Sequence, residues 1–434
     1  MQVDFTKRVL PNGLPVIVHE DHHCPIVGVS VWYHVGSQDE RPGRTGFAHL
    51  FEHLMFEGSE HQDGSYFQPL QQAGASLNGS TSTDRTNYWE VVPTNALELA
   101  LWMESDRMGC LLPALTQRKF ENQREVVLNE RRQNYENRPY GLAPVAMSAA
   151  LFPPDHPYHW LTIGWPEDLR AATLDEVHAF FATYYHPGNA SLALAGDVDP
   201  DRAFALVEDC FGAIPAAARP PRTLRRASLP AERRLVLEDR VELPRLYMAW
   251  HTPGLFQDGD ADLDLAGDIL GSGKPSRLYR TLVFDRRVAI DAAAGQNSRE
   301  LSSLFQVTAT AAPDHSLAEL EQLVTAEIDR VAAHGPTESE LERGLARAEA
   351  AFVFRLQHVG GFGGRSDQLN AYNIYLGDPG FFARDWERYT HVTPASIRDI
   401  VQRDLRPDAR VVLSVVPRGR LDLAVSGSEP IHVS

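Results

Sequence analysis

The sequence is poor in cysteine. Its 434 residues include only three cysteines, Cys24, Cys110 and Cys210, which lie far apart and are odd in number. That count and spacing fit neither a disulfide framework nor a cysteine-based zinc module. Free or buried thiols are therefore expected, and they favour a reducing compartment.

Long apolar runs are also missing. No stretch reaches the roughly 18 apolar residues that a membrane-spanning helix requires. The first residues, Met1 to Thr6, lack the basic start and the apolar run of an export signal. We therefore expect no membrane insertion and a cytoplasmic location, or a periplasmic one if a signal has been removed.

Positive charge is in deficit. Lysine and arginine number 41 against 58 aspartates and glutamates, which gives a formal net charge of −17. This balance argues against general binding to nucleic acid or to anionic membranes. An acidic cavity that collects basic peptides is one interpretation, and an ordinary solvated acidic surface is the other.

What the chain does contain is typical of a globular protein, with 43% hydrophobic and 23% charged residues. Single cores stop growing at about 250–300 residues, so more than one domain is expected. The clearest break is a proline- and arginine-rich stretch from Ile214 to Arg225. It predicts an N-terminal domain over 1–213, a linker over 214–232 and a C-terminal domain over 233–434.

The two predicted domains look like a diverged repeat. A helix pattern, a proline and an apolar strand occur in the same order around Pro187 and around Pro407, which lie 220 residues apart. Near the start of each half, Gly36 and Gly254 end similar segments and lie 218 residues apart. Nearly equal offsets indicate a duplication, with chance similarity as the alternative. Each half mixes strands of antiparallel type with amphipathic helices, so the predicted fold class is α+β.

The chain opens with a pattern of strands. Two β-rich runs, 7–10 and 14–18, flank a Pro-Asn-Gly turn, and a third run covers 26–34. A helix is then predicted over 46–57, ended by Gly58, and a second over 116–136, with Thr116 as its N-cap.

The first of these helices carries two histidines and a glutamate at the spacing His49-x-x-Glu52-His53. Positions i and i+4 share one helical face, so both imidazoles can reach one ion. Apolar neighbours indicate a buried helix, on which three such side chains are costly unless something compensates them. A zinc ion would do so, although a motif this short arises by chance in roughly 5% of comparable chains.

The string from Gly46 to Gly58 resembles the active-site helix of the pitrilysin/insulysin family, the inverzincins with their H-x-x-E-H motif. The resemblance implies one Zn²⁺ per chain, with His49 and His53 as ligands. The family's third ligand is a glutamate on a later helix, and Glu130, which lies 77 residues after His53, matches its position.

The helix pattern around Glu130 agrees with that role. Val126, Val127 and Glu130 are expected to share an inward face, while a solvated glutamate among arginines is the alternative. In the family, the glutamate of the motif takes a proton from water and passes it to the leaving amine, which assigns catalysis to Glu52. Gln123 stands where the family often has a glutamate that orients a ligand, and an amide adds less basicity.

A polar segment, 77–88, resembles the family's edge strand, to which a peptide substrate adds by backbone pairing. The resemblance implies that substrate is bound by residues Asn78, Gly79, Ser80 and Thr81. A simple polar hairpin is the alternative.

The second half lacks the metal motif, because its corresponding segment, 261–273, contains no histidine. Self-sufficient members of the family carry an arginine and a tyrosine in this half that grip the substrate. Arg277 matches the arginine, but Ile290 aligns with the tyrosine and cannot donate a hydrogen bond. Tyr279 lies on the wrong turn to replace it.

The family encloses its substrate between two such two-domain halves, and this chain has one. The resemblance therefore implies a homologous partner subunit that carries the Arg/Tyr pair. An unlike partner, as in the mitochondrial processing peptidase and paired bacterial relatives, is favoured over a second copy. The glycine-rich segment Gly360 to Gly364 is either a flexible substrate-guiding loop or a simple turn.

These observations predict a zinc metalloendopeptidase subunit that hydrolyses unfolded peptides inside a two-subunit clamshell. The alternatives are a non-catalytic structural subunit of the same fold and a peptide-binding module that holds zinc. All four chemical residues of the motif are present, which favours the enzyme.

Overall fold

The computed structural model describes residues 2–223 and 227–433, which form two compact units. Unit 1 comprises Met1–Glu130, Trp160–Thr223 and Ala351–Arg384, and unit 2 comprises Arg131–His159, Leu224–Ala350 and Asp385–Ser434. Among the described residues, no helix is long and apolar enough to cross a membrane.

Unit 1 is built on a six-stranded sheet with the order β1-β2-β6-β3-β5-β4. Only the β2–β6 pair is parallel. The order leaves β4 at one edge of the sheet. The strands are β1 (Thr6–Val9), β2 (Pro15–Glu20), β3 (Ile26–Tyr33), β4 (Ser76–Thr81), β5 (Thr86–Pro93) and β6 (Ala190–Gly196).

Unit 2 is built on a second six-stranded sheet, with the order β12-β7-β11-β8-β10-β9. The run β7-β11-β8-β10-β9 repeats β2-β6-β3-β5-β4, with a parallel first pair and antiparallel pairs after it. This shared topology confirms the α+β duplication. The strands are β7 (Arg233–Asp239), β8 (Arg245–Thr252), β9 (Ala289–Asn297), β10 (Ser303–Ala311), β11 (Arg410–Pro417) and β12 (Glu429–Pro430).

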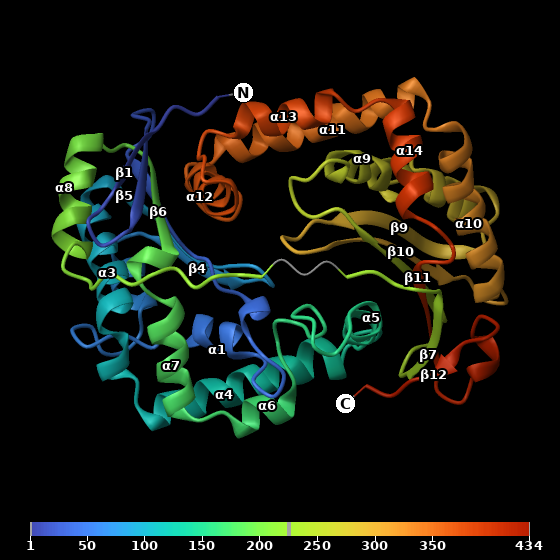
Figure 1. Ribbon diagram of the computed structural model, residues 1–434, viewed down its shortest axis with the longest axis horizontal. Coiled ribbons are helices and arrows are strands. Elements are labelled where there is room, and N and C mark those ends of the chain that lie inside the picture. Colours follow the sequence, from blue (N-terminus) through green and yellow to red (C-terminus); the bar gives the residue numbers. More distant parts are fainter. Residues whose placement is uncertain (1, 224–226, 434) are drawn as a thin grey trace. The chain divides into compact units, whose positions relative to one another are not determined.

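Helices cover both faces of the first sheet. Helices α3 and α8 lie on one face and α12 on the other (Figure 1). The helices that belong to unit 1, wholly or for most of their length, are α1 (Phe47–Leu54), α2 (Phe67–Gln72), α3 (Leu97–Ala114), α4 (Gln117–Arg131), α6 (Pro166–Ala171), α7 (Leu174–Tyr184), α8 (Pro200–Phe211) and α12 (Arg365–Leu376).

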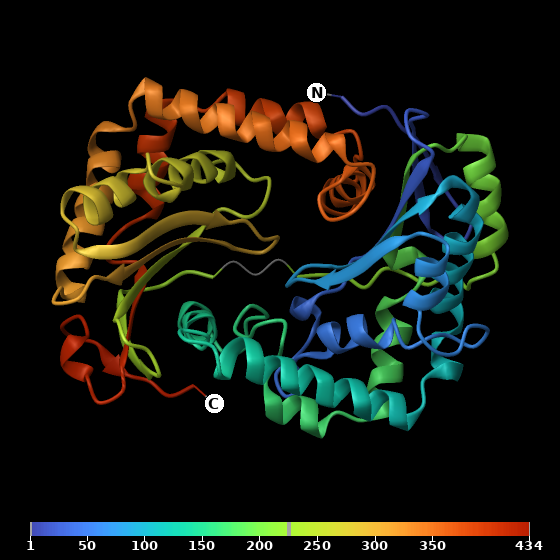
Figure 2. The same cartoon turned by 180° about the vertical axis from the view of Figure 1, so that it is seen from behind.

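The second sheet is likewise covered on both faces (Figure 1 and Figure 2). Along β8, Leu246, Met248 and Trp250 join one core with the neighbouring helices, while Tyr247 and Ala249 join another with α5. This alternation is the period of two expected of a strand buried on both sides. The remaining helices are α5 (Ala143–Leu151), α9 (Asp260–Gly271), α10 (Leu317–His334), α11 (Glu338–Gln357), α13 (Phe382–Thr390) and α14 (Pro394–Asp404).

The two repeats exchange one helix. Helix α5 comes from the first half of the chain and packs on the second sheet, whereas α12 comes from the second half and packs on the first sheet. Asp367 of α12 accepts hydrogen bonds from Trp32 Nε1 (2.7 Å) and Asn87 Nδ2 (2.8 Å). Asn370 donates to the Ser30 carbonyl at 2.7 Å. The exchange therefore rests on buried polar bonds as well as on apolar packing.

The compact units consequently differ from the continuous domains predicted over 1–213 and 233–434, because each unit includes a helix from the other half. Within the predicted linker, 224–226 lie outside the described residues. Arg222, on the described side, forms an ion pair with Asp39 (Nη2–Oδ2, 2.5 Å) and donates to the Asp84 carbonyl. This part of the predicted linker is therefore held against unit 1.

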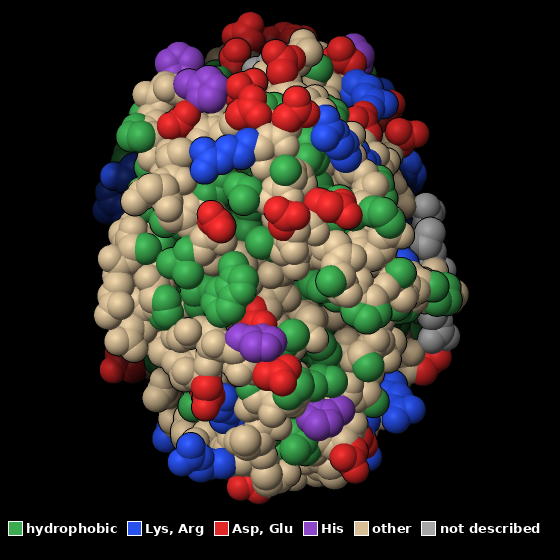
Figure 3. Space-filling model, turned by 90° about the vertical axis from the view of Figure 1, so that its left-hand side faces the viewer, with side chains coloured by type: hydrophobic (Ala, Val, Ile, Leu, Met, Phe, Trp, Pro, Cys, Tyr) green, Lys and Arg blue, Asp and Glu red, His purple; other side chains and the backbone are tan. Residues whose placement is uncertain are grey.

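One face of the molecule carries mixed charge. On the face shown in Figure 3, acidic and basic side chains are interspersed, with hydrophobic groups between them. This arrangement agrees with an ordinary solvated acidic surface, one of the two interpretations of the net charge.

Candidate active site

The site is built on α1, which is buried on one side and held firmly at its start. Leu50, Phe51 and Leu54 are fully buried. The ring of Phe51 stacks on Phe180 (centroids 5.3 Å apart) and on Tyr185 (5.1 Å). These contacts fix the rotation of the helix and so decide which way its polar face points.

A buried glutamate anchors the first turn of α1. Glu40 accepts hydrogen bonds from the backbone N–H groups of Gly46 (3.0 Å) and Ala48 (2.8 Å) and from Trp160 Nε1 (2.9 Å). Burial nevertheless raises the pKa of Glu40 to about 8. Gly46 precedes the helix with φ 86°, a left-handed conformation that glycine adopts at no steric cost. The sequence pattern gave no sign of the role of Glu40.

The two histidines of α1 converge on Glu130 of α4. The His49 and His53 rings lie 4.9 Å apart and are perpendicular. Their Nε2 atoms lie 3.6 Å and 3.5 Å from Glu130 Oε2, respectively. Val127 is buried as expected, but Val126 is 43% exposed, so the prediction that Val126 faces inward is wrong. One helical turn separates Val127 from Glu130, which keeps the carboxylate on the inward side.

This arrangement fits a zinc ion. Two ligand atoms about 2.1 Å from a tetrahedral zinc lie about 3.4 Å apart, close to the separations seen here. Burial and the neighbouring His53 lower the pKa of His49 to about 4, although Glu130 opposes them. His49 is therefore neutral near pH 7 and keeps a lone pair for a metal. Two imidazoles and one carboxylate also leave a fourth position open, as in catalytic zinc sites.

Gln123 links His53 to Glu57, a carboxylate that lies outside the motif. His53 Nδ1 donates to Gln123 Oε1 at 3.3 Å, and Gln123 Nε2 donates to Glu57 Oε1 at 2.6 Å. If the Gln123 amide were flipped, its oxygen would face the Glu57 carboxylate, and two acceptors cannot form a hydrogen bond. This chain of bonds keeps the proton on Nδ1 and leaves Nε2 free to face Glu130. The spacing of Glu57, four residues after His53, was the signal that could have revealed it.

We expect Gln123→Leu to weaken zinc binding about 10–100-fold, because it removes the group that orients His53. Isothermal titration of the metal-free protein would measure the change. The matched control is the exchange Gln123→Glu with Glu57→Gln, which keeps a carboxylate paired with an amide and should retain affinity. Equal affinities for Gln123→Leu and the unmodified protein would contradict the orienting role.

Glu52 lies beside the convergent group and is tied to the edge strand. Its Oε2 accepts a hydrogen bond of 2.7 Å from the hydroxyl of Thr81, the last residue of β4. Burial raises the pKa of Glu52, although the Thr81 bond, His53 and Arg85 oppose the shift. A carboxylate with a raised pKa can both accept and return a proton near neutrality.

A pocket of about 760 Å³ adjoins this site and is lined by Glu52, His53, Asn78 and Gln123 among others. β4 borders it and, among the strands that the structure describes, has a hydrogen-bonded neighbour on one side only. Gly79 is closely packed, since a Cβ there would lie 3.0 Å from Tyr88 and 3.1 Å from Phe56. The Ser80 side chain is already hydrogen-bonded within the sheet, because its hydroxyl donates to Asn87 Oδ1 at 2.6 Å.

Arg277, the remaining predicted site residue, and Ile290, which aligns with the family's tyrosine, belong to unit 2. Glu340 holds the Arg277 guanidinium through bonds of 2.7 Å and 2.8 Å. Within unit 2, the structure therefore pairs Arg277 with Glu340. Ile290, in β9, is 53% exposed.

The glycine-rich segment is a compact turn. The Gly364 N–H donates to the Gly361 carbonyl (3.1 Å), and the Gly363 N–H donates to Asp367 (2.7 Å). Phe362 packs edge-on against Trp89 with ring centroids 5.4 Å apart. These bonds favour the simple turn among the two interpretations of this segment.

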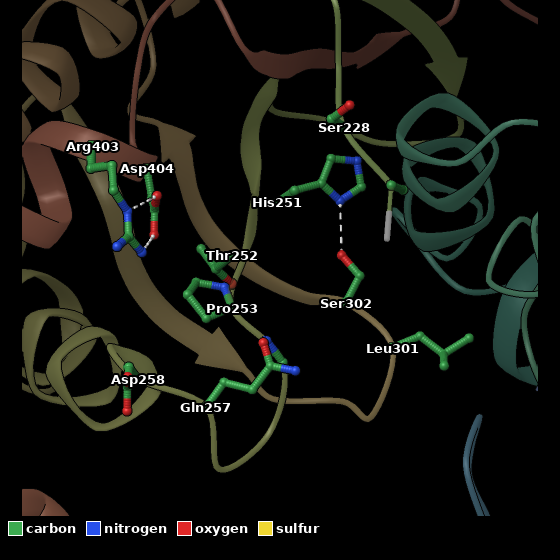
Figure 4. Close-up of a pocket in the computed structure, with 12 residues that line it drawn as sticks. Ser228, His251, Thr252, Pro253, Gln257, Asp258, Leu301, Ser302, Arg403 and Asp404 are labelled. Atoms are coloured by element: carbon green, nitrogen blue, oxygen red, sulfur yellow. Dashed lines mark hydrogen bonds and ion pairs between the residues drawn. The ribbon is translucent and has the colours of Figure 1, made fainter. Parts of the chain in front are cut away.

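Unit 2 has a pocket of its own, of about 750 Å³. Figure 4 shows the Ser302 hydroxyl directed at the His251 ring and Arg403 paired with Asp404. Only two groups of potential metal ligands occur among the described residues, and both lie in unit 1. This pocket therefore offers one imidazole and no group for holding a metal.

His251 predicts a pH effect on stability. Its Nε2 donates to the Leu151 carbonyl at 2.9 Å, and burial lowers its pKa from 6.5 to about 4. The unfolded chain takes up this proton first, so stability is complete above pH 6.5 and falls towards pH 4. The loss amounts to about 3 kcal/mol.

Urea unfolding of the native protein and a His251→Gln variant at several pH values would test this effect. The stability of the variant should fall less steeply below pH 6.5. His49 titrates in both proteins, so the difference between their unfolding free energies at each pH isolates the contribution of His251. Parallel curves for the two proteins would contradict the assignment.

Comparison with known proteins adds to this geometry. Residues 15–153 match the insulinase family (peptidase family M16), and residues 171–347 match a family described as the peptidase M16 inactive domain. The chain is 29% identical over 356 residues to the zinc protease PqqE of Helicobacter pylori, covering 80% of this chain and 79% of that protein. It is 31% identical over 344 residues to ML0855 of Mycobacterium leprae, described as an uncharacterized zinc protease, covering 77% of this chain and 75% of that protein.

Solved structures share the fold. A protease from Helicobacter pylori matches with a TM-score of 0.89 and 24% identity over 96% of this chain and 100% of that one. A peptidase M16 inactive domain from Pseudomonas fluorescens matches with a TM-score of 0.85 and 20% identity over 99% of this chain and 100% of that one. The periplasmic protease PqqL of Escherichia coli matches with a TM-score of 0.80 and 17% identity, over 98% of this chain and 49% of that one.

Proposed function

The chain belongs to the insulinase family of M16 peptidases, and we propose that it is the zinc-bearing, catalytic subunit of a metalloendopeptidase that cleaves unfolded peptides. The observation that carries this proposal is the convergence of His49 Nε2, His53 Nε2 and Glu130 Oε2 beside Glu52. The alternatives are a structural subunit and a peptide-binding module. A complete set of chemical residues favours the enzyme over the structural subunit, and activity with and without a partner would distinguish the enzyme from the peptide-binding module.

The proposed chemistry divides between the ion and the chain. His49, His53 and Glu130 would hold Zn²⁺, which supplies Lewis acidity that activates water near neutral pH and polarises the scissile carbonyl. Glu52 would accept the proton of the attacking water and return it to the leaving amine. The Thr81 hydroxyl holds the Glu52 carboxylate in place and so positions the base beside the edge strand.

The proposed substrate is an extended peptide that adds to the free edge of β4. Backbone pairing of this kind requires an unfolded segment and reads shape more than sequence. Asn78 lines the pocket beside His53, so substrate paired along Asn78 to Thr81 would run past the proposed metal ligands. The network from Thr81 to Glu52 would couple substrate pairing to the placement of the base.

We include in the proposal a homologous partner subunit that carries the Arg/Tyr pair. Two observations support this need: Glu340 engages Arg277, and Ile290 stands in the tyrosine position with a side chain that cannot hydrogen-bond. An unlike partner is preferred and a second copy is the alternative. For the location, the periplasmic option gains support from PqqL, which is described as periplasmic.

The test is cleavage of a quenched fluorescent, basic, unstructured peptide, with the zinc content determined on the same sample. We expect about one zinc per chain at this site, with cleavage that a chelator abolishes and added zinc restores. Zinc without cleavage by the chain alone, followed by cleavage once a homologous Arg/Tyr subunit is added, would support the unlike pair. Absence of both zinc and cleavage after added zinc would leave the structural subunit, whereas bound zinc with no cleavage under any of these conditions would leave the peptide-binding module.

A further inference from the structure

A second group of potential metal ligands lies in unit 1, apart from the site of α1. One ligand atom from each of Glu60, His61 and Cys110 lies within 4.8 Å of the others. The set combines a carboxylate, an imidazole and a thiol. Thiol and imidazole ligands together select zinc and related transition metals over Mg²⁺ or Ca²⁺.

A buried carboxylate orients the imidazole of this group. Asp106 of α3 is 6% exposed, and its Oδ1 lies 2.6 Å from His61 Nδ1. Asp106 Oδ2 in turn accepts hydrogen bonds from the Ser59 hydroxyl and from the backbone N–H of His61. His61 Nδ1 is therefore the protonated nitrogen, and Nε2 is left as the ligand atom. A carboxylate behind a histidine in this way is the usual support of a metal-bound imidazole.

The backbone brings the thiol to the same place. Helix α3 departs from helical geometry at Cys110 (φ −129°, ψ 24°), and the Cys110 carbonyl accepts a hydrogen bond of 2.9 Å from Glu60 N–H. This bond joins the segment after α1 directly to α3. Cys110 is partly exposed, whereas the Glu60 and His61 side chains are exposed, so they can move the short distance that coordination requires.

We propose that Glu60, His61 and Cys110 form a second binding site for a divalent transition-metal ion, with zinc as the expected occupant. The Cys110 sulfur would bind as a thiolate, and its proton would pass to solvent. His61 Nε2 and the Glu60 carboxylate complete the protein ligands, and water occupies the remaining position. Burial raises the pKa of the Cys110 thiol, so without metal the thiol stays protonated at neutral pH.

The site would tie the wall of the adjoining pocket to α3. The segment that follows His61 supplies Asp63, Gly64 and Ser65 to the pocket beside His53. Within this segment, Asp63 is already paired with Lys119 of α4 at 2.6 Å. An ion at His61 would add a second attachment, just before Asp63. The proposal does not depend on the function proposed for Glu52.

The test is titration of the metal-free, reduced protein with Co²⁺, observed through thiolate-to-cobalt charge-transfer absorption. The group at His49 contains no sulfur, so this absorption reports the thiol site alone. We expect about one equivalent of the signal, lost in Cys110→Ser and weakened at least about tenfold in affinity in His61→Gln. Cys24→Ser and Cys210→Ser are the matched controls and should keep it.

A His49→Ala, His53→Ala variant separates the two sites, since it should retain the charge-transfer signal while losing one equivalent of bound metal. Circular dichroism would verify that each variant is folded. A signal that survives Cys110→Ser, or no signal at saturating Co²⁺ in the unmodified protein, would overturn the proposal. So would a His61→Gln protein that binds with unchanged affinity.

Discussion

Substitution of Glu52 by glutamine is expected to reduce peptide cleavage by about 10³-fold or more while the zinc content stays unchanged. Glutamine keeps the size of the side chain and can still accept the Thr81 hydrogen bond of 2.7 Å. It cannot take up a proton from water at neutral pH. The change therefore removes proton transfer and leaves His49, His53 and Glu130 in place.

The measurement is kcat for the fluorescent peptide, with zinc determined on the same preparation. Glu125→Gln is the matched control, because Glu125 is an exposed glutamate of α4 outside the site. Since Glu52 does not hold the metal in our proposal, KM should change less than kcat. Wild-type turnover by Glu52→Gln would remove Glu52 from the chemistry, and a loss of zinc would make it a ligand or a structural support.

The local elements of the fold could be predicted because their signals are local. The runs 14–18 and 26–34 correspond to β2 (Pro15–Glu20) and β3 (Ile26–Tyr33). The helix pattern that precedes Pro187 corresponds to α7 (Leu174–Tyr184), which begins with a capping box between Thr173 and Glu176. Apolar periodicity and capping act over a few residues, so one segment contains the whole signal.

The exchange of α5 and α12 could not be predicted, because the partner of a buried face is not encoded in the helix itself. An apolar stripe on α5 fits either sheet, and tertiary packing decides between them. The C-terminal end of α4 was also predicted only in part. The predicted helix over 116–136 is α-helical only to Arg131 and continues as a π-helix over Arg132–Glu136. Helix ends are in general less well determined than helices.

Only part of the candidate site could be predicted from the sequence. His49, Glu52 and His53 share one short helix, so their spacing alone predicts a common face. Glu130 came from the family resemblance, and the structure brings it within 3.6 Å of both Nε2 atoms. The spacing of His53 and Glu57 is a local signal, but the bond from Gln123 to Glu57 joins side chains 66 residues apart, and that link leaves no pattern in a single sequence.

Substitution of Glu130 by alanine is expected to weaken zinc binding on the order of 10³-fold. Structural zinc sites contribute about 10–16 kcal/mol in total, so one of three protein ligands accounts for about 3–5 kcal/mol. Glu130 is also the anionic member of the group, and two neutral imidazoles alone hold a divalent cation poorly. Activity should fall in parallel with the zinc content and recover in part when excess zinc is added.

Zinc affinity measured by competition with a chelator, together with NMR titration of the metal-free protein, would test this role. Glu130 is among the groups that raise the pKa of His53 against the effect of burial, so that pKa should fall in Glu130→Ala. Glu125→Ala, on the same helix, should change neither quantity. If Glu130→Ala lowered the His53 pKa yet bound zinc normally, Glu130 would be an electrostatic neighbour of the histidines and the third ligand would have to be sought elsewhere.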